Sequence, residues 1–403
     1  MNEESLRYQG WRVATASGVG VFFAALFVFT FAVLLRALSH EFSWSREAIS
    51  SAYGAMTLSS ALAAPVMGQL VDRWGPKVIV GPSLVLGASA FASLSVLTPH
   101  LWHLYLVYVL IGLATAGTSP VVYSRVISGW FDRRLGTALA VMVASAGLGA
   151  IVHPPVIETL MGSTGWRGAC LVLGVVTLAV GVPTVARFVR EPREDEKRAH
   201  AGIPGASIGL ALRSRIFWTL LVVVFGTTLA TNSVIVHLSA LLIDRGLPSN
   251  QAITVMSTMG AASLAGRLLT GWLLDRFDAI RVSFVLLTVA ALGAYLLATA
   301  SSFAIGVIAS VCIGFGTGGE VDVIPYLLSR YFGIRSLATL FGVIWMAFGL
   351  AGAAGPILMG RAFDSTGSYE GVLIALSVCM ISAAALVLTL PAYQSRIGAA
   401  SVA

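Results

Sequence analysis

Apolar runs follow one another along the whole of this 403-residue chain and are separated by short clusters of charged residues. An α-helix needs about 20 apolar residues to cross the roughly 30 Å hydrocarbon core of a bilayer, and most of the runs reach that length. Only 11% of the residues are charged, whereas a soluble domain carries about 25%. The pattern predicts an all-α membrane protein rather than a soluble one.

Twelve runs are long enough to be transmembrane helices. The expected spans are 13–38, 48–71, 77–97, 102–129, 135–158, 167–187, 216–242, 250–274, 280–300, 303–329, 336–361 and 371–391. If both termini are cytoplasmic, 18 of the 25 Lys and Arg residues lie on the cytoplasmic side, five lie outside, and Arg125 and Arg267 remain within spans. Because cytoplasmic loops carry an excess of basic residues, this asymmetry predicts the orientation.

The two halves of the chain repeat each other. The segment from Gly68 to Arg73 closes the second span, and the segment from Gly271 to Arg276 closes the eighth at an offset of 203 residues. We therefore expect two pseudo-symmetric six-helix bundles, 1–190 and 215–403, joined by a polar cytoplasmic linker, 191–214. Such duplications place a binding site near the bilayer midplane between the halves, which rock to give alternating access.

The loop after the second span reads Gly68-x-x-x-Asp72-Arg73-x-Gly75-Pro76-Lys77 and resembles the signature loop of the major facilitator superfamily. Gly75 permits a tight turn, and the charges could latch the cytoplasmic side by pairing with a neighbouring helix end. Asp275 and Arg276 occupy the repeated positions. The alternative is that these charges only report topology, since exposed ion pairs are weak.

Several further motifs give a narrower resemblance. They are Gly10-Trp11-Arg12, Glu41-Phe42-Ser43-Trp44-Ser45-Arg46, Gly165-Trp166-Arg167, Arg330-Tyr331-Phe332-Gly333 and Gly355-Pro356. Together they resemble the bacterial branch of the monocarboxylate transporter and oxalate:formate antiporter group. This resemblance implies transport of a small monocarboxylate across the bacterial inner membrane, coupled to a proton.

Arg267 lies eight residues before Asp275, hence about 12 Å from the cytoplasmic end of its span. An ionisable residue within a span is costly and is by default a functional candidate. A guanidinium presents a planar fork that grips both oxygens of a carboxylate. The position also matches the substrate-binding arginine of the family, although the family's aspartate one turn earlier is replaced here by Ser263. The alternative is a structural arginine that ties helices together.

Glu320 and Asp322 follow a glycine-rich run in the tenth span. In a regular helix, side chains two residues apart point about 200° apart, so both cannot face one cavity. Either one faces a cavity and the other faces a helix, or the glycines interrupt the helix locally. We expect at least one to act in proton coupling or gating; alternatively, they are structural partners of Arg125.

Other polar and aromatic side chains within the spans are weaker candidates. Arg125 could be a second contact for the anion, form one arm of a cytoplasmic gate or snorkel to the interface. Tyr123 and His237 could help to orient the substrate, although the histidine could instead satisfy a nearby carbonyl. Asn232 is a further polar candidate, and Trp345 could form a wall of the pocket or serve only in packing.

Other functions find little support in the sequence. Cys170, Cys312 and Cys379 are far apart within apolar runs, so neither a disulfide framework nor a metal site is predicted. We expect no cofactor, no enzyme activity and no nucleic-acid binding. The expected partners are a small organic anion, a proton and the lipid bilayer, and we expect a monomer.

The oxalate:formate antiporters have a lysine in the eleventh span, and the absence of a lysine from 340–360 implies that the substrate has a single carboxylate. The alternatives are efflux of a larger organic anion or drug and a carboxylate sensor that does not transport.

Overall fold

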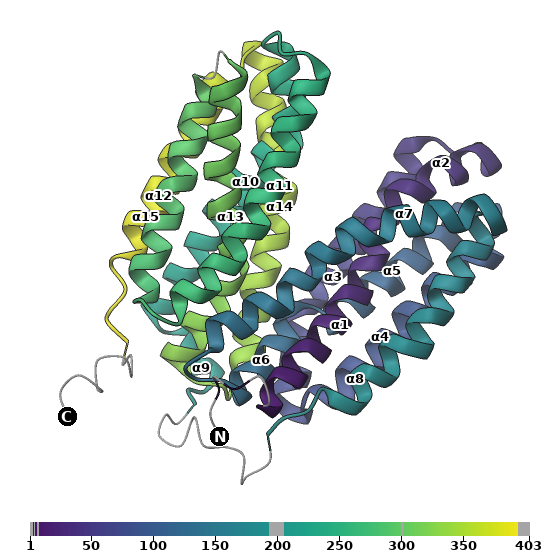
Figure 1. Cartoon of the computed structure of the whole chain (residues 1–403), viewed down its shortest axis with the longest axis horizontal. Coiled ribbons are helices and arrows are strands. Elements are labelled where there is room, and N and C mark those ends of the chain that lie inside the picture. The colour runs from purple at the N-terminus through teal and green to yellow at the C-terminus, as the bar shows by residue number, and fades with distance from the viewer. Residues whose placement is uncertain (1–2, 4, 6–7, 193–204, 300–301, 394–403) are drawn as a thin grey trace. The chain divides into compact units, whose positions relative to one another are not determined.

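The computed structural model describes residues 3, 5, 8–192, 205–299 and 302–393, and these residues form helices and no strand (Figure 1). The first half contains α1 (Gln9–Phe29), α2 (Phe31–Phe42), α3 (Arg46–Trp74), α4 (Pro76–Ser93), η1 (Leu94–Val96), α5 (Leu101–Gly117), α6 (Pro120–Trp130), α7 (Leu135–Val176), η2 (Thr177–Gly181) and α8 (Val182–Phe188). The second half contains α9 (Ile208–Leu212), α10 (Arg215–Asp244), α11 (Ser249–Leu274), α12 (Ala279–Ala298), α13 (Phe303–Phe332), α14 (Leu337–Thr366) and α15 (Glu370–Val387).

The predicted membrane architecture is confirmed. Among the described residues, 11 helical segments are long and apolar enough to cross a membrane. One of them, Leu135–Phe188, runs for 54 residues and contains two of the expected spans. Its helical geometry is interrupted at Gly165, where φ is 69° and ψ is 170°, so the segment accounts for the fifth and sixth spans of a twelve-helix protein.

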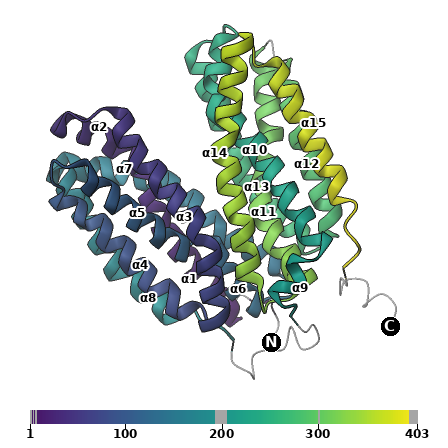
Figure 2. The same cartoon turned by 180° about the vertical axis from the view of Figure 1, so that it is seen from behind.

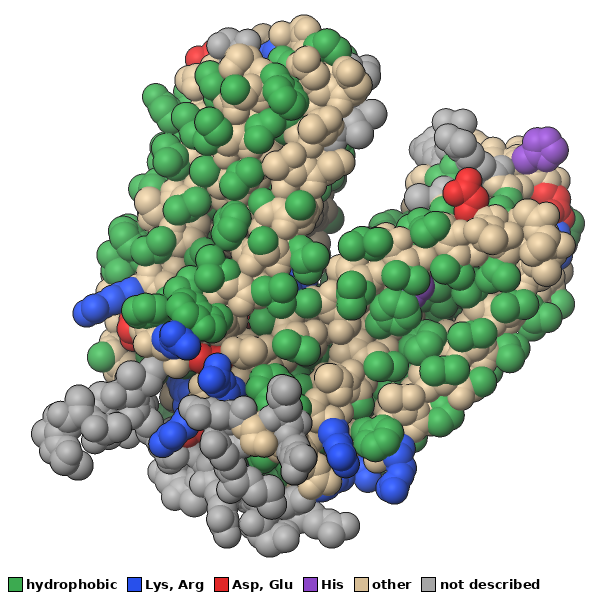
Figure 3. Space-filling view, viewed as in Figure 1, with side chains coloured by type: hydrophobic (Ala, Val, Ile, Leu, Met, Phe, Trp, Pro, Cys, Tyr) green, Lys and Arg blue, Asp and Glu red, His purple; other side chains and the backbone are tan. Residues whose placement is uncertain are grey.

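Large apolar side chains are exposed along the helices, as expected for surfaces that face lipid. Leu62, Trp102, Ile151 and Val378 each expose more than half of their surface. Apolar side chains extend along the helices in Figure 3, whereas basic side chains gather by the α8 end of one helical group and the α9 end of the other. This distribution agrees with the clustering of charge in the sequence.

The helices cluster into two compact units. Unit 1 comprises Met1–Arg133, Val141–Gly205 and Ile334–Met346, and unit 2 comprises Arg134–Ala140, Ala206–Gly333 and Ala347–Ala403. The first residues of α7 therefore belong to unit 2, and the first residues of α14 belong to unit 1. These two short segments distinguish the units from the predicted halves 1–190 and 215–403. Residues 193–204 of the predicted linker lie outside the described part of the chain.

Each unit has its own apolar core. In unit 1, Leu26, Phe91 and Tyr108 are almost fully buried. In unit 2, Leu238 and Ile313 are almost fully buried, and α10, α12, α13 and α15 lie side by side in both views (Figures 1 and 2). Unit 2 therefore presents a packed scaffold for polar side chains.

Helices α11 and α13 pack through glycines, which allow close backbone approach. A Cβ atom built on Gly318 of α13 would lie 2.1 Å from the Ser263 carbonyl oxygen of α11, and one on Gly266 would lie 2.7 Å from the Phe315 carbonyl oxygen. Such distances leave no room for a side chain at either position. The glycine-rich run therefore brings α13 into contact with α11 without interrupting its helix.

Candidate functional site

Arg267 and Asp322 form an ion pair across the contact between α11 and α13. The Arg267 Nε donates to the Gly318 carbonyl oxygen at 3.1 Å and lies 3.7 Å from the Asp322 Oδ2. The Asp322 side chain is fully buried, whereas the Arg267 side chain remains 17% exposed. Neither Asp322 oxygen accepts a hydrogen bond within the described part of the chain. The carboxylate is thus held by charge rather than by a close, bidentate hydrogen-bonded geometry.

Glu320 points to another helix. Its Oε1 lies 2.5 Å from the Thr227 hydroxyl oxygen and 2.8 Å from the Thr228 hydroxyl oxygen, both on α10. Because α13 is a continuous helix, the two acids diverge as a separation of two residues requires. Asp322 faces Arg267 on α11, and Glu320 faces α10.

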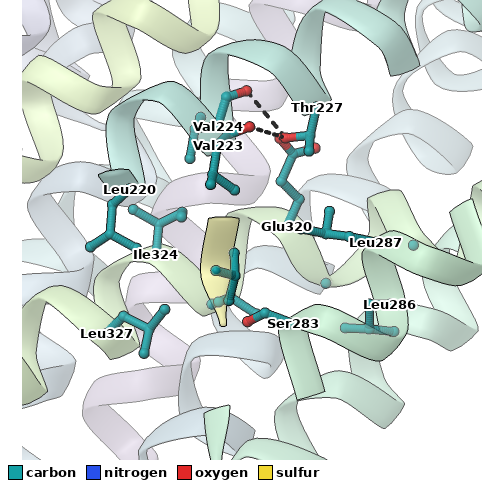
Figure 4. Close-up of a pocket in the computed structure, with 14 residues that line it drawn as sticks. Leu220, Val223, Val224, Thr227, Ser283, Leu286, Leu287, Glu320, Ile324 and Leu327 are labelled. Carbon is teal, nitrogen blue, oxygen red and sulfur yellow. Dashed lines mark hydrogen bonds between the residues drawn. The ribbon is translucent and has the colours of Figure 1, made fainter. Parts of the chain in front are cut away.

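A small cavity adjoins Glu320. Its lining comes from α10, α12, α13 and α15 and consists mainly of Leu, Val and Ile side chains (Figure 4). Thr227 and Ser283 are the hydroxyl-bearing members of this lining. The carboxyl group of Glu320 therefore lies in a largely aliphatic environment.

His237 lies on α10, ten residues after Thr227. Its Nε2 is 3.1 Å from the Pro356 carbonyl oxygen and its Nδ1 is 3.4 Å from the Tyr369 hydroxyl. Because a carbonyl can only accept, Nε2 carries a proton and donates it to Pro356. Ten residues of α10 separate Thr227 from His237, about 15 Å at the rise of an α-helix. The hydrogen bonds of His237 connect α10 to Pro356 of α14 and to Tyr369.

The remaining predicted binding residues, Asn232, Tyr123 and Trp345, each lie against residues of their own unit. The Asn232 amide donates to the Thr228 carbonyl oxygen one turn earlier on α10. In unit 1, Tyr123 is fully buried, and a Cβ atom on Gly20 would lie 1.9 Å from its hydroxyl oxygen. Trp345, also in unit 1, packs edge-on against Phe341. Neither Tyr123 nor Trp345 belongs to the unit that contains Arg267.

Two aspartates hold the N-termini of long helices. In unit 1, Asp72 accepts from the backbone N–H groups of Ala338 and Thr339 and from the Thr339 hydroxyl at the start of α14. In unit 2, Asp275 accepts the same three kinds of hydrogen bond from Gly136 and Thr137 at the start of α7. A carboxylate is favourable there because helix N-termini present unsatisfied N–H groups and partial positive charge.

The other members of the predicted latch do not join these contacts. Arg73 is exposed, and Arg276 lies over the Trp272 ring at 4.2 Å. Gly75 adopts φ 83° and ψ 162° between α3 and α4, a conformation that suits glycine. Burial raises the pKa of the Asp275 carboxyl, and the hydrogen bonds from Thr137 and Gly136 act in the opposite direction.

Arg125 pairs with two acids of unit 1. Its Nη1 lies 3.3 Å from Asp72 and its Nη2 lies 3.1 Å from Glu191, where the linker begins. Glu320 and Asp322, the partners suggested for Arg125, have partners of their own in unit 2. Arg125 instead connects the Asp72 contact to the beginning of the linker.

Sequence reasoning missed the hydroxyl-bearing partners of the acids. Thr227 and Thr228 meet Glu320, but isolated threonines within an apolar run give no clear signal. Thr137 and Thr339 did give a signal in the sequence, because they recur at an offset of 202 residues, beside the repeat of Asp72 and Asp275. The internal repeat could therefore have identified the partners of both aspartates.

Comparisons with known proteins agree with this architecture. The family model described as Major Facilitator Superfamily matches residues 17–356. The chain is 27% identical over 361 residues to the uncharacterized MFS-type transporter YhjX of Escherichia coli (strain K12), covering 85% of this chain and 86% of that protein. It is also 26% identical over 346 residues to monocarboxylate transporter 11 of Homo sapiens, covering 82% and 72%.

Solved structures share the fold at low identity. A crystal structure of the E. coli fucose:proton symporter FucP has a TM-score of 0.72 and 14% identity, covering 94% of this chain and 98% of that one. The human organic anion transporter MFSD10 has a TM-score of 0.72 and 15% identity, covering 94% and 99%. Likeness at this level of identity concerns the fold alone.

Proposed function

Because this chain belongs to the major facilitator superfamily, we propose that it is a secondary carrier of a small monocarboxylate, moved together with a proton by alternating access. The substrate class is a 2-oxo or 2-hydroxy acid. The similarity to monocarboxylate transporter 11 supports this class. The single observation that carries the proposal is the part-exposed Arg267 guanidinium, held within a span beside a buried carboxylate.

Arg267 binds the carboxylate of the substrate. Its Nε is anchored to the Gly318 carbonyl oxygen, so the guanidinium is oriented by α13 before a substrate arrives. Pre-orientation lowers the entropy cost of binding. The 3.7 Å separation from Asp322 makes this internal pair weaker than a bidentate one, so a substrate carboxylate can compete for the guanidinium.

Asp322 carries the proton that accompanies the substrate. Two ionised carboxylates beside one guanidinium would leave a net negative charge within a span, which is costly in a low-dielectric environment. Protonation of Asp322 removes that charge when the substrate binds. The family's aspartate would have stood at Ser263 on α11, one turn before Arg267; here α13 supplies an acid to the same guanidinium.

The other polar contacts serve the scaffold in this proposal. His237 ties α10 to α14 and to Tyr369, while Asp72 and Asp275 stabilise one conformational state by holding the starts of α14 and α7. We propose that the protein lies in a bacterial inner membrane as a monomer with both termini cytoplasmic, and that it uses neither a cofactor nor a metal.

Uptake and binding assays test the proposal. Purified protein in proteoliposomes should exchange a labelled 2-oxo or 2-hydroxy acid, and an inward pH gradient should accelerate uptake. Arg267→Ala should weaken acid binding in a thermal-shift assay at least tenfold, about 1.4 kcal/mol. The matched control is Arg361→Ala, which removes an exposed arginine from the same unit and should leave the affinity unchanged. Equal affinities in the two variants, or no uptake across a broad panel of acids, would contradict the proposal.

A further inference from the structure

Glu320 and Thr227 make a short oxygen–oxygen contact in which either residue can supply the shared proton. The Thr227 hydroxyl oxygen lies 2.5 Å from the Glu320 Oε1, 2.9 Å from the Val223 carbonyl oxygen and 3.2 Å from the Val224 carbonyl oxygen (Figure 4). A hydroxyl has only one proton to donate. If Thr227 donates to Val223, its short contact with Glu320 requires a proton on the glutamate. If Thr227 donates to Glu320, the glutamate is ionised.

We propose that Glu320, with Thr227 and Thr228, forms a second proton-carrying site, separate from the Arg267–Asp322 pair. The binding step forms an O–H bond at the Glu320 Oε1. That O–H donates to the Thr227 hydroxyl oxygen, and the Thr227 hydroxyl proton turns to the Val223 carbonyl oxygen. Thr228 donates to the same Oε1 at 2.8 Å in both states. Uptake and release therefore need only one hydroxyl rotation.

Among the described residues that line the cavity beside Glu320, none carries a charge that could balance an ionised carboxylate. The cavity beside it is lined by aliphatic groups, including Leu220 and Val224 from α10, Leu286 and Leu287 from α12, and Val387 from α15. No lining residue besides Glu320 is ionisable. A buried carboxylate without a cation is costly, and a proton is the smallest cation that removes the cost.

The two acidic sites are separated by the body of α13. Asp322 faces Arg267 on α11, whereas Glu320 faces α10, and its hydrogen bonds involve neither Arg267 nor Asp322. Substrate binding at Arg267 therefore does not displace a partner of Glu320. The role of this second proton in coupling rests on the proposed function, and its consequence is one extra positive charge moved with each acid.

Infrared difference spectroscopy of the purified full-length protein tests the site without any substrate. Wild type should show the C=O stretch of a protonated carboxyl in an apolar environment at low pH, and the band should disappear as the pH rises. Glu320→Gln should lose this band, and Asp322→Asn should keep it. Thr227→Val, which retains the acid, should shift the band because the partner hydroxyl is gone. The matched control is Thr288→Val on α12, whose hydroxyl bonds only to its own helix, and it should leave the band unmoved.

Persistence of the whole titrating band in Glu320→Gln, or a Glu320 band that does not change with pH, overturns the proposal. An unchanged frequency of the C=O band in a folded Thr227→Val variant also overturns the proposal. In proteoliposomes with a transported acid, Glu320→Gln should lower the charge moved per acid by one elementary charge, and an unchanged value overturns the coupling role. If wild type moves no acid but keeps the Glu320 band, the proposed function fails and the proton site stands.

Discussion

The carboxylate of Asp72 accepts two hydrogen bonds from Thr339, one from its backbone N–H at 2.7 Å and one from its hydroxyl at 2.6 Å. Asp275 repeats this arrangement with the backbone N–H and hydroxyl of Thr137. In both contacts, an aspartate at the end of one span occupies the N-terminus of another helix. The internal repeat of the sequence therefore appears in the structure as two equivalent interactions.

Neutralising either aspartate should weaken the hold on its helix. Asp72→Asn and Asp275→Asn should each destabilise the protein by about 1 kcal/mol, the usual contribution of a cap or of a charge at a helix end. Thermal unfolding in detergent measures this effect. Arg73→Gln is the control because Arg73 is exposed. A loss of stability in the control as large as in the aspartate variants would show that the helix contacts are unimportant.

A side chain at Gly318 should separate α11 from α13. In Gly318→Ala the new methyl group would meet backbone atoms of Ser263 and Arg267 at 2.1 and 2.8 Å, and backbone cannot move aside cheaply. We expect a loss of about 1–3 kcal/mol, typical of overpacking, together with weaker acid binding at Arg267. Gly260→Ala, where nothing lies within 4 Å, should be neutral in both assays. Full stability of Gly318→Ala would argue against this close contact.

His237 should act as a tie between helices. His237→Phe removes the hydrogen bonds to Pro356 and Tyr369, so it should lower stability by about 1 kcal/mol and leave the acid dissociation constant unchanged. The control is His40→Phe, which replaces an exposed histidine. Weaker acid binding at unchanged thermal stability would place His237 in the substrate site instead.

Glu41 should give a pH-dependent contribution to stability at one end of unit 1. Hydrogen bonds from Arg167 and Trp166 hold the pKa of its carboxyl below the ordinary value of 4.5. A depressed pKa means that the stabilisation is present above pH 4.5 and is lost as the pH falls through the folded-state pKa. The difference in melting temperature between wild type and Glu41→Gln should be small, because the pair is part-exposed, and should vanish on acidification. A difference that grows at low pH would contradict this assignment.

The sequence was sufficient to predict the spans and the internal repeat, because the cost of charge in a bilayer leaves a strong signal. The same signal made Arg267 a candidate, and the structure places it beside Asp322. The sequence did not predict which helix each acid faces. That depends on the glycine contacts at Gly266 and Gly318, which fix the register between α11 and α13. The pairing of Arg125 with Asp72 and Glu191 was not predicted for the same reason: side-chain pairing between distant helices follows from packing, and spacing along the chain does not encode it. The contact of Thr227 with Glu320 was not predicted, because a hydroxyl within a span can always bond to its own helix, as Thr227 also does.

The first residues of α7 belong to unit 2, and the first residues of α14 belong to unit 1. This arrangement determines what happens when the chain is divided into its two halves. A chain cut within residues 193–204 would give two polypeptides, each lacking a segment of its own unit: 334–346 for the first and 134–140 for the second. Each fragment alone would carry an aspartate with no N-terminus to cap. The two halves should therefore fold well only when they are produced together and should purify as a pair.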